Sequence, residues 1–177
     1  MVDPTEAEAW FQRDCVKVMT YAPEQDPDNV LPEIARAHGV KLQIGHSGCD
    51  YHQASELFGC GCGVTHLFNA MSGLHHRDPG VAFAALSTAE YAEIICDELH
   101  VAEPAFQLAR GRIPQLYSVT DSTSAAGMPD GEYQLGTHKV YKKNESVTLR
   151  DGTLAGSAAT ADLVVKILRK FGLDWVE

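Results

Sequence analysis

The chain has 177 residues, 45% of them hydrophobic, which is enough apolar material for one ordinary domain and excludes disorder throughout. Its formal net charge of -10 argues against nucleic acid as the main partner, because binding phosphates needs a basic surface. No stretch approaches the ~20 apolar residues of a membrane span, and the acidic start of the chain is unlike a signal peptide. We therefore expect no membrane partner and no export.

Short apolar runs alternate with amphipathic stretches from the start of the chain as far as Asp121. The apolar runs predict five strands, at Val16–Tyr21, Lys41–Gly45, Val64–Thr65, Ala92–Cys96 and Leu116–Thr120. The helical spacing of apolar residues between the strands predicts helices at Val30–His38, Tyr51–Gly59 and Glu103–Arg110. This alternation is typical of βα units in an α/β protein with a parallel sheet.

The pattern changes at Gly131, where short apolar runs are broken by Gly, Asn and Asp. These runs predict two or three antiparallel strands. A last helix is expected at Thr160–Phe171, with one apolar stripe and an end at Gly172.

The cysteines favour a reduced, cytoplasmic setting, because there are five of them without the spacing of a disulfide framework. Cys60 and Cys62 are separated by one residue and lack the second pair that a structural zinc site requires. We expect the cysteines to be structural.

A polar residue follows four of the predicted strands: His46, His66, His100 and Asp121. The strand ends of a (β/α)8 barrel meet at one mouth, so these side chains are expected to converge there. Imidazole nitrogens and carboxylate oxygens are usual ligands of a divalent metal, and Asp121 would be the natural general base for a metal-activated water. At each position, a hydrogen-bonded structural role is the alternative.

The segment Thr65–Gly80 adds an amide at Asn69 and a cationic cluster of His75, His76 and Arg77. A guanidinium presents a planar fork that suits phosphate oxygens. A solvated loop with a Pro-Gly turn is the alternative for this segment.

Five motifs of the chain, in this order and spacing, resemble the N-acetylglucosamine-6-phosphate deacetylase family of amidohydrolases over nearly its whole length. They are GHS at Gly45–Ser47, VTHLFNAMSGLHHRDPG at Val64–Gly80, VTD at Val119–Asp121, AAGMPDGEYQLG at Ala125–Gly136 and DGTLAGS at Asp151–Ser157. The segment Thr20–Glu24 (TYAPE) also resembles the family at the end of a barrel strand. The resemblance implies a partial (β/α)8 TIM barrel of the metal-dependent amidohydrolase type, about strands 4–8, with part of a small β-sandwich.

Three segments are expected on this basis. Residues 1–130 would form the C-terminal part of the catalytic barrel, 131–157 a strand segment of the sandwich with a pocket loop, and 158–177 the last barrel helix. The family's remaining metal ligand, a glutamate on an earlier strand, has no counterpart in the chain. We therefore expect a fragment that is inactive on its own.

The resemblance also assigns site residues. His46 and His66 match metal ligands, Asp121 the catalytic aspartate, and His100 the histidine that polarises the acetamide carbonyl. Glu98 stands where the family has glycine. The substrate-binding positions implied are Asn69, Ala70, Arg77, Asp97, Glu98, Leu99, His100, Leu154, Ala155 and Gly156.

The activity implied is hydrolysis of N-acetylglucosamine 6-phosphate to glucosamine 6-phosphate and acetate. The implied cofactor is a divalent metal, zinc first, with iron, manganese or cobalt as alternatives. The implied assembly is a homodimer or homotetramer. Two alternatives stay open. One is a deacetylase for a related amino-sugar phosphate, because Glu98 takes the place of a smaller glycine near the expected pocket. The other is an inactive fragment that serves as a binding or assembly module.

Overall fold

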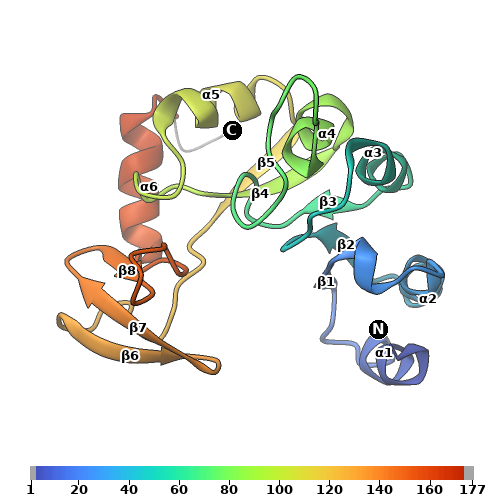
Figure 1. Cartoon of the computed structure of the whole chain (residues 1–177), viewed down its shortest axis with the longest axis horizontal. Coiled ribbons are helices and arrows are strands. Elements are labelled where there is room, and N and C mark those ends of the chain that lie inside the picture. Colours follow the sequence, from blue (N-terminus) through green and yellow to red (C-terminus); the bar gives the residue numbers. More distant parts are fainter. Residues whose placement is uncertain (1–2, 174–177) are drawn as a thin grey trace. The chain divides into compact units, whose positions relative to one another are not determined.

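A computed structural model of the chain describes residues 3–173, which form one five-stranded sheet, one three-stranded sheet and the helices around them (Figure 1). Residues 1–2 and 174–177, which belong to the first and last predicted segments, lie outside the described residues. The chain divides into two units, Met1–Glu93 with Ala109–Tyr117 and Ile94–Leu108 with Ser118–Glu177. Each unit is described by itself below.

The larger sheet has its strands in sequence order, as expected for consecutive βα units. β1 to β4 pair in parallel, with Tyr21 opposite Ile44 and Val64 opposite Ala92. The predicted α/β class with a parallel sheet is thereby confirmed. The strands are β1 (Val18–Tyr21), β2 (Lys41–Ile44), β3 (Gly63–Val64), β4 (Tyr91–Ile95) and β5 (Gln115–Val119).

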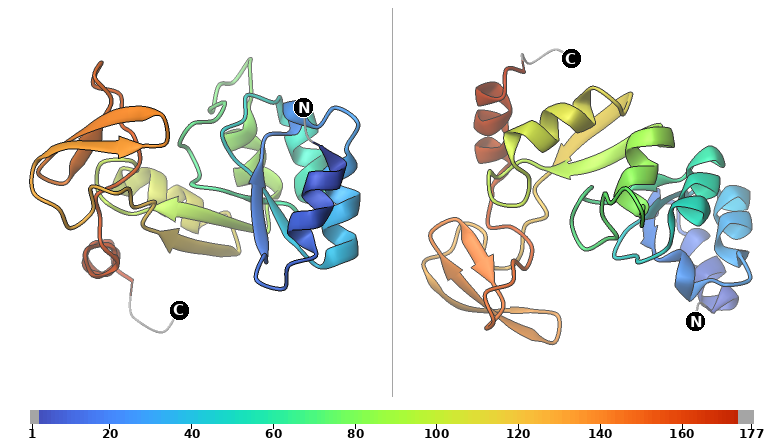
Figure 2. Two further views of the ribbon diagram at one scale, coloured as in Figure 1. Left: turned by 90° about the horizontal axis from the view of Figure 1, so that it is seen from below. Right: turned by 45° about the horizontal axis from the view of Figure 1, so that its top comes forward.

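Three predicted helices have the predicted bounds: α2 (Val30–His38), α3 (Tyr51–Gly59) and α5 (Glu103–Arg110). In α2 the apolar face buries Leu31 and Ala35, and the helix ends at Gly39, whose φ of 67° is one that glycine adopts readily. Figures 1 and 2 show α2, α3 and α4 following one another on the same side of the strands. They cover that face of the sheet.

Two helices were not predicted, α1 (Pro4–Phe11) and α4 (Val81–Thr88). The sequence of α4, VAFAALST, is apolar almost all round, so it has no amphipathic stripe to recognise. The start of α1 depends on Asp3, whose side chain accepts hydrogen bonds from the backbone of Thr5 and Glu6. A single 3-10 turn, η1 (Pro23–Gln25), follows β1.

The second unit contains the antiparallel sheet and the last helix. The three strands β6 (Gly131–Leu135), β7 (His138–Lys143) and β8 (Ser146–Thr148) pair in that order, which confirms the predicted antiparallel strands. Helix α6 (Ala161–Lys170) lies within the predicted range. A small core at the antiparallel sheet is formed by Ala125, Val140, Val147 and Ala158.

Within residues 3–173 the helices are too short or too polar to cross a membrane.

Gly45, at the end of β2, is packed too closely to accept a side chain. A Cβ atom there would lie 2.7 Å from Cγ2 of Thr20 and 2.8 Å from Cβ of Thr65. We expect Gly45→Ala to lower the free energy of unfolding by about 1–3 kcal/mol, because neighbouring strands would have to shift. Urea denaturation measures this, with Gly48→Ala as the control, since a Cβ at Gly48 has no neighbour within 4 Å. Equal effects of the two substitutions would contradict the prediction.

Candidate active site

Two histidines meet at the ends of neighbouring strands in the first unit. His46 follows β2 by two residues and His66 follows β3 by two residues. Their Nε2 atoms are 2.9 Å apart, and their rings lie edge to face with centroids 4.7 Å apart. His66 is buried, whereas His46 is exposed. Two imidazole nitrogens therefore point at one place from separate strands.

The donor chemistry of this pair fits a divalent metal. Among residues 3–173, Nδ1 of His66 is buried and has no hydrogen-bond partner, so the other nitrogen, Nε2, makes the ring's polar contact. Neutral imidazole nitrogens are common ligands of zinc and related ions. Over residues 3–173, no group of three or more His, Cys, Asp or Glu side chains is arranged to hold a metal. The described part of the chain thus offers two ligands for such an ion.

Three of the predicted site residues adopt a positive φ just after a strand. The φ angles are 52° at His46, 32° at His66 and 48° at Asp121, and each residue stands two positions after its strand. Positive φ is uncommon in residues other than glycine and is often found at functional sites. The chain turns sharply at each of these strand ends instead of continuing the strand.

Glu24 fixes the segment that follows His46. Its carboxylate accepts a hydrogen bond from Oγ of Ser47 at 2.7 Å and another from the backbone N–H of Gly48 at 2.9 Å. Burial acts to raise the pKa of Glu24, but these hydrogen bonds hold that pKa below its ordinary value. The carboxylate therefore stays ionised and acts as an acceptor next to the histidine pair.

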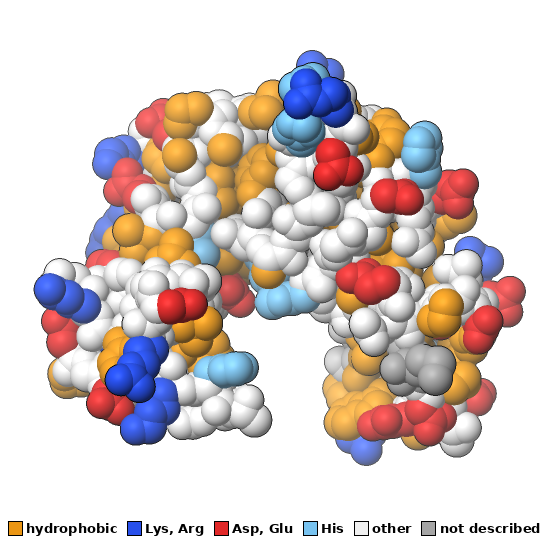
Figure 3. Space-filling model, viewed as in Figure 1, with side chains coloured by type: hydrophobic (Ala, Val, Ile, Leu, Met, Phe, Trp, Pro, Cys, Tyr) orange, Lys and Arg blue, Asp and Glu red, His pale blue; other side chains and the backbone are white. Residues whose placement is uncertain are grey.

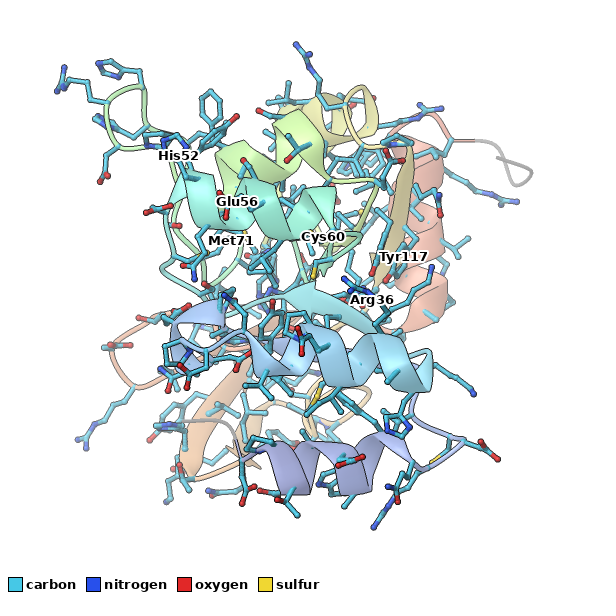
Figure 4. All side chains as sticks on the ribbon, turned by 90° about the vertical axis from the view of Figure 1, so that its right-hand side faces the viewer. Arg36, His52, Glu56, Cys60, Met71 and Tyr117 are labelled. Atoms are coloured by element: carbon cyan, nitrogen blue, oxygen red, sulfur yellow. The ribbon has the colours of Figure 1, made fainter. Side chains whose placement is uncertain are left out.

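A chain of polar side chains crosses the first unit's sheet beside the histidines. Oγ1 of Thr65 donates to Oε1 of Gln43 at 3.0 Å, so the 2.7 Å contact between Thr65 and Thr20 must be donated by Thr20. Nε2 of Gln43 donates to Oη of Tyr117, labelled in Figure 4, and Tyr117 in turn donates to Glu93 at 3.3 Å. This row of side chains links β1, β2, β4 and β5 to Thr65, the residue directly after β3, and so supports the strand ends that carry the histidines.

The loop after His66 contains three predicted substrate-binding residues. The Nδ2 group of Asn69 donates to the carbonyls of His66 and Leu67, so this amide also holds the turn. Ala70 is exposed, with a φ of 49°. Arg77 is exposed too, and its Nη1 donates to Nε2 of His76 at 2.9 Å. At the top of Figure 3, His side chains lie beside Lys or Arg side chains and project into solvent.

Asp97 and His100 form a buried pair in the second unit. Nδ1 of His100 lies 2.6 Å from Oδ2 of Asp97, and the same oxygen accepts a hydrogen bond from Oγ of Ser157 at 2.8 Å. Oδ1 of Asp97 accepts from the backbone N–H groups of Leu99 and His100. Burial acts to raise the pKa of Asp97, but the hydrogen bond from the His100 ring, followed by those from the backbone and Ser157, lowers it below its ordinary value.

This ionised carboxylate fixes the tautomer and orientation of His100. An ionised carboxylate only accepts hydrogen bonds, so the proton between the two groups belongs to Nδ1 of His100. The other nitrogen, Nε2, is then the atom that can face a ligand.

Glu98 and Leu99 lie between these two residues. Glu98 has a φ of 63°, and its carboxylate forms an ion pair with Lys170 of α6. Leu99 is 44% exposed, so its side chain is open to contact. Glu98 is therefore held by a helix of its own unit.

Asp121 is exposed at the end of β5, and the predicted pocket loop lies next to it. The backbone N–H of Ser157 donates to the carbonyl of Asp121 at 2.9 Å. Gly156 has a φ of 61°, and a Cβ there would lie 2.7 Å from Cγ2 of Thr123 and 3.6 Å from Oδ2 of Asp121. Leu154 is 40% exposed, whereas Ala155 packs against the small core of this unit.

The structure brings the predicted residues together in two groups, one in each unit. Two residues that support these groups were not predicted from the sequence. Glu24 holds the segment after His46, and Ser157 holds Asp97. Both fall inside motifs of the sequence, TYAPE and DGTLAGS.

No family model matches the chain. It is 40% identical over 138 residues to N-acetylglucosamine-6-phosphate deacetylase from Vibrio furnissii, a match that covers 76% of this chain and 35% of that protein. It is 34% identical over 157 residues to N-acetylgalactosamine-6-phosphate deacetylase from Escherichia coli O157:H7, covering 85% of this chain and 41% of that protein. The chain therefore spans less than half the length of these relatives.

A solved structure is similar over nearly the whole chain. It is the D267A mutant of N-acetyl-D-glucosamine-6-phosphate deacetylase from Mycobacterium smegmatis, in complex with N-acetyl-D-glucosamine-6-phosphate. The TM-score is 0.88 at 30% sequence identity, and the match covers 98% of this chain and 48% of that one.

Proposed function

The chain belongs to the N-acetylglucosamine-6-phosphate deacetylase family, and on that premise we propose that it takes part in the hydrolysis of N-acetylglucosamine 6-phosphate. The products are glucosamine 6-phosphate and acetate. The observation that supports this best is the meeting of His46 and His66, whose Nε2 atoms are 2.9 Å apart at the ends of two parallel strands. The five-stranded sheet would be an arc of a (β/α)8 barrel, and the three-stranded sheet would be part of a small β-sandwich.

Each site residue of the chain has a separate role in the proposed reaction. His46 and His66 would hold a divalent ion, zinc first, which supplies Lewis acidity and makes water more acidic when it is bound. Asp121 takes a proton from the water that attacks the acetamide carbon. It returns that proton to the nitrogen when the C–N bond breaks, so that acetate and the free amine leave. His100, fixed through Nδ1 by Asp97, presents Nε2 to the carbonyl oxygen.

Further parts of the proposal concern the setting of the reaction. The substrate is a small phosphorylated sugar bound partly through Asn69 and Arg77, and the assembly is a homodimer or homotetramer. All five cysteines are free, which is compatible with the reducing cytoplasm.

Metal binding by the histidine pair can be tested directly on the chain. Equilibrium dialysis against zinc should show binding that His66→Ala weakens at least about 10-fold, because one of two imidazole ligands is lost. His52→Ala is the control, since His52 is an exposed histidine on α3 (Figure 4). Zinc affinity that is equal in the two variants would remove the metal site from the proposal.

A substrate panel tests the reaction and its alternatives. Acetate release is measured with zinc present, for N-acetylglucosamine 6-phosphate and for N-acetylgalactosamine 6-phosphate, the latter because one relative is named for it. Faster release from the glucosamine derivative supports the proposal. Faster release from the galactosamine derivative favours the related deacetylase. Zinc binding without any acetate release would point to a binding or assembly module.

Arg77 is expected to select for the phosphate. It lies exposed beside His75 and His76 in an acidic chain, and a charge-assisted hydrogen bond to phosphate contributes about 1.5–3 kcal/mol. In a complete enzyme that contains this chain, Arg77→Ala should therefore lower kcat/KM for the phosphorylated sugar by about 10- to 100-fold, with little change for unphosphorylated N-acetylglucosamine. Arg36→Ala, an exposed arginine on α2 (Figure 4), is the matched control. The same loss for both sugars would mean that Arg77 supports the loop instead.

A further inference from the structure

Ser157 is a buried residue with polar contacts to two parts of its unit. It is 1% exposed. Its backbone N–H donates to the carbonyl of Asp121, and its own carbonyl accepts from the N–H of Thr123 at 2.9 Å. Its hydroxyl donates to Oδ2 of Asp97 at 2.8 Å and accepts from the N–H of Ala159 at 2.9 Å. One residue thus links the segment of Asp121 to the carboxylate that holds His100.

We propose that Ser157 is a positioning residue. It fixes the Asp97 carboxylate, so that the His100 ring keeps a constant position relative to the backbone of Asp121. This inference rests on the proposed function, because it assigns to Ser157 a part in the deacetylation attributed to Asp121 and His100. Neither the sequence motifs nor the comparisons assign a role to this serine.

The direction of the hydrogen bonds supports this role. A hydroxyl has one proton, and the hydroxyl of Ser157 already accepts from Ala159, so its proton goes to Asp97. An ionised carboxylate is an acceptor only, so Oδ2 of Asp97 is shared by two donors, Ser157 and Nδ1 of His100. The Ser157 hydroxyl sets where that shared oxygen lies.

Removal of the Ser157 hydroxyl should therefore affect the position of the His100 ring. Oδ1 of Asp97 would still be held by the two backbone N–H groups of Leu99 and His100. Oδ2 would keep only the imidazole donor, and the carboxylate would be freer to turn about the bond between Cβ and Cγ. The ring of His100 would follow that oxygen, while the backbone contacts of Ser157 to Asp121 would remain.

The test measures His100 in the full chain by NMR, as the exchange rate of its Nδ1–H proton with solvent. We expect Ser157→Ala to raise this rate by about 10- to 100-fold, since a hydrogen bond to a charged group is lost. Ser157→Thr keeps the hydroxyl and should restore the slow exchange. Ser157→Cys keeps the size with a weak donor and should give an intermediate rate. Ser122→Ala is the control, because the hydroxyl of Ser122 donates to the carbonyl of Ala159 instead.

Acetate release with zinc is measured on the same variants. Ser157→Ala should lower kcat by about 10- to 100-fold at an unchanged KM, and Ser157→Thr should recover it. An exchange rate in Ser157→Ala and Ser157→Cys equal to that of the wild type would overturn the inference, even if turnover fell. Acetate release from the zinc-loaded wild type bears on the proposed function alone. The exchange rates would still decide whether Ser157 positions His100.

Discussion

In a complete enzyme that contains this chain, replacing Asp121 by asparagine is expected to lower kcat for acetate release by about 10²–10⁴ while the bound metal is retained. An amide has the shape of a carboxylate but cannot accept and return a proton at neutral pH. The substitution should leave the fold intact, because Asp121 is exposed and has a φ of 48°, a conformation that asparagine tolerates well. The backbone hydrogen bond from Ser157 to residue 121 does not involve the side chain that changes.

The experiment compares turnover and metal content in the same samples. Asp162→Asn on α6 is the control for loss of one exposed carboxylate. Turnover near the wild-type rate in Asp121→Asn would remove this residue from the mechanism. Loss of metal together with turnover would show that Asp121 acts as a ligand and not as the proton carrier.

Much of the fold could be predicted because its local signals are strong. Glycines and polar residues bound the apolar runs of β1 to β5, and amphipathic stretches at α2, α3 and α5 gave the helix bounds without error. The helix α4 was missed because its residues are apolar on nearly every side and form no stripe. The helix α1 was missed because its start depends on one cap, Asp3, within a polar segment.

The candidate site could be predicted only in part, for a different reason. His46, His66 and Asp121 stand just after strands, so their position at the strand ends was enough to predict them as site residues. Their catalytic roles stay predictions. The supports of the site could not be found in this way. Glu24 acts on residues 23 and 24 positions away, and Ser157 acts on Asp97 at a separation of 60. Hydrogen bonds over such separations leave no periodic pattern in a sequence.

Asp97→Asn is expected to lower the free energy of unfolding by about 1–3 kcal/mol at about pH 7, because it leaves buried hydrogen-bond donors without their acceptor. The carboxylate is 5% exposed and accepts four hydrogen bonds, from two backbone N–H groups, the His100 ring and Ser157. An asparagine would place an NH2 group against the donors of His100 or Ser157, or turn it toward the backbone donors. In either orientation buried donors would lose their acceptor.

The pH dependence of unfolding tests this prediction most directly. The pKa of Asp97 is lowered from an ordinary value of 3.8, so the folded state holds its proton less tightly than the unfolded state does. The stabilisation is therefore fully present above that value and is lost as the pH falls below it. Urea denaturation of the wild type and of Asp97→Asn is measured at a series of pH values. The difference between their free energies of unfolding should be constant near neutrality and should become smaller in acid.

Asp162 provides the control for this experiment. Hydrogen bonds from Lys166 and Thr160 lower its pKa to about 2, but the carboxylate lies on the exposed side of α6, where solvent screens the charge. Asp162→Asn should accordingly leave the urea midpoint close to that of the wild type at every pH. If Asp162→Asn and Asp97→Asn shifted the midpoint equally, burial of the Asp97 and His100 pair would not be the source of its stability. If the difference for Asp97→Asn stayed constant into acid, the carboxylate would not be stabilised in its ionised form by these four donors.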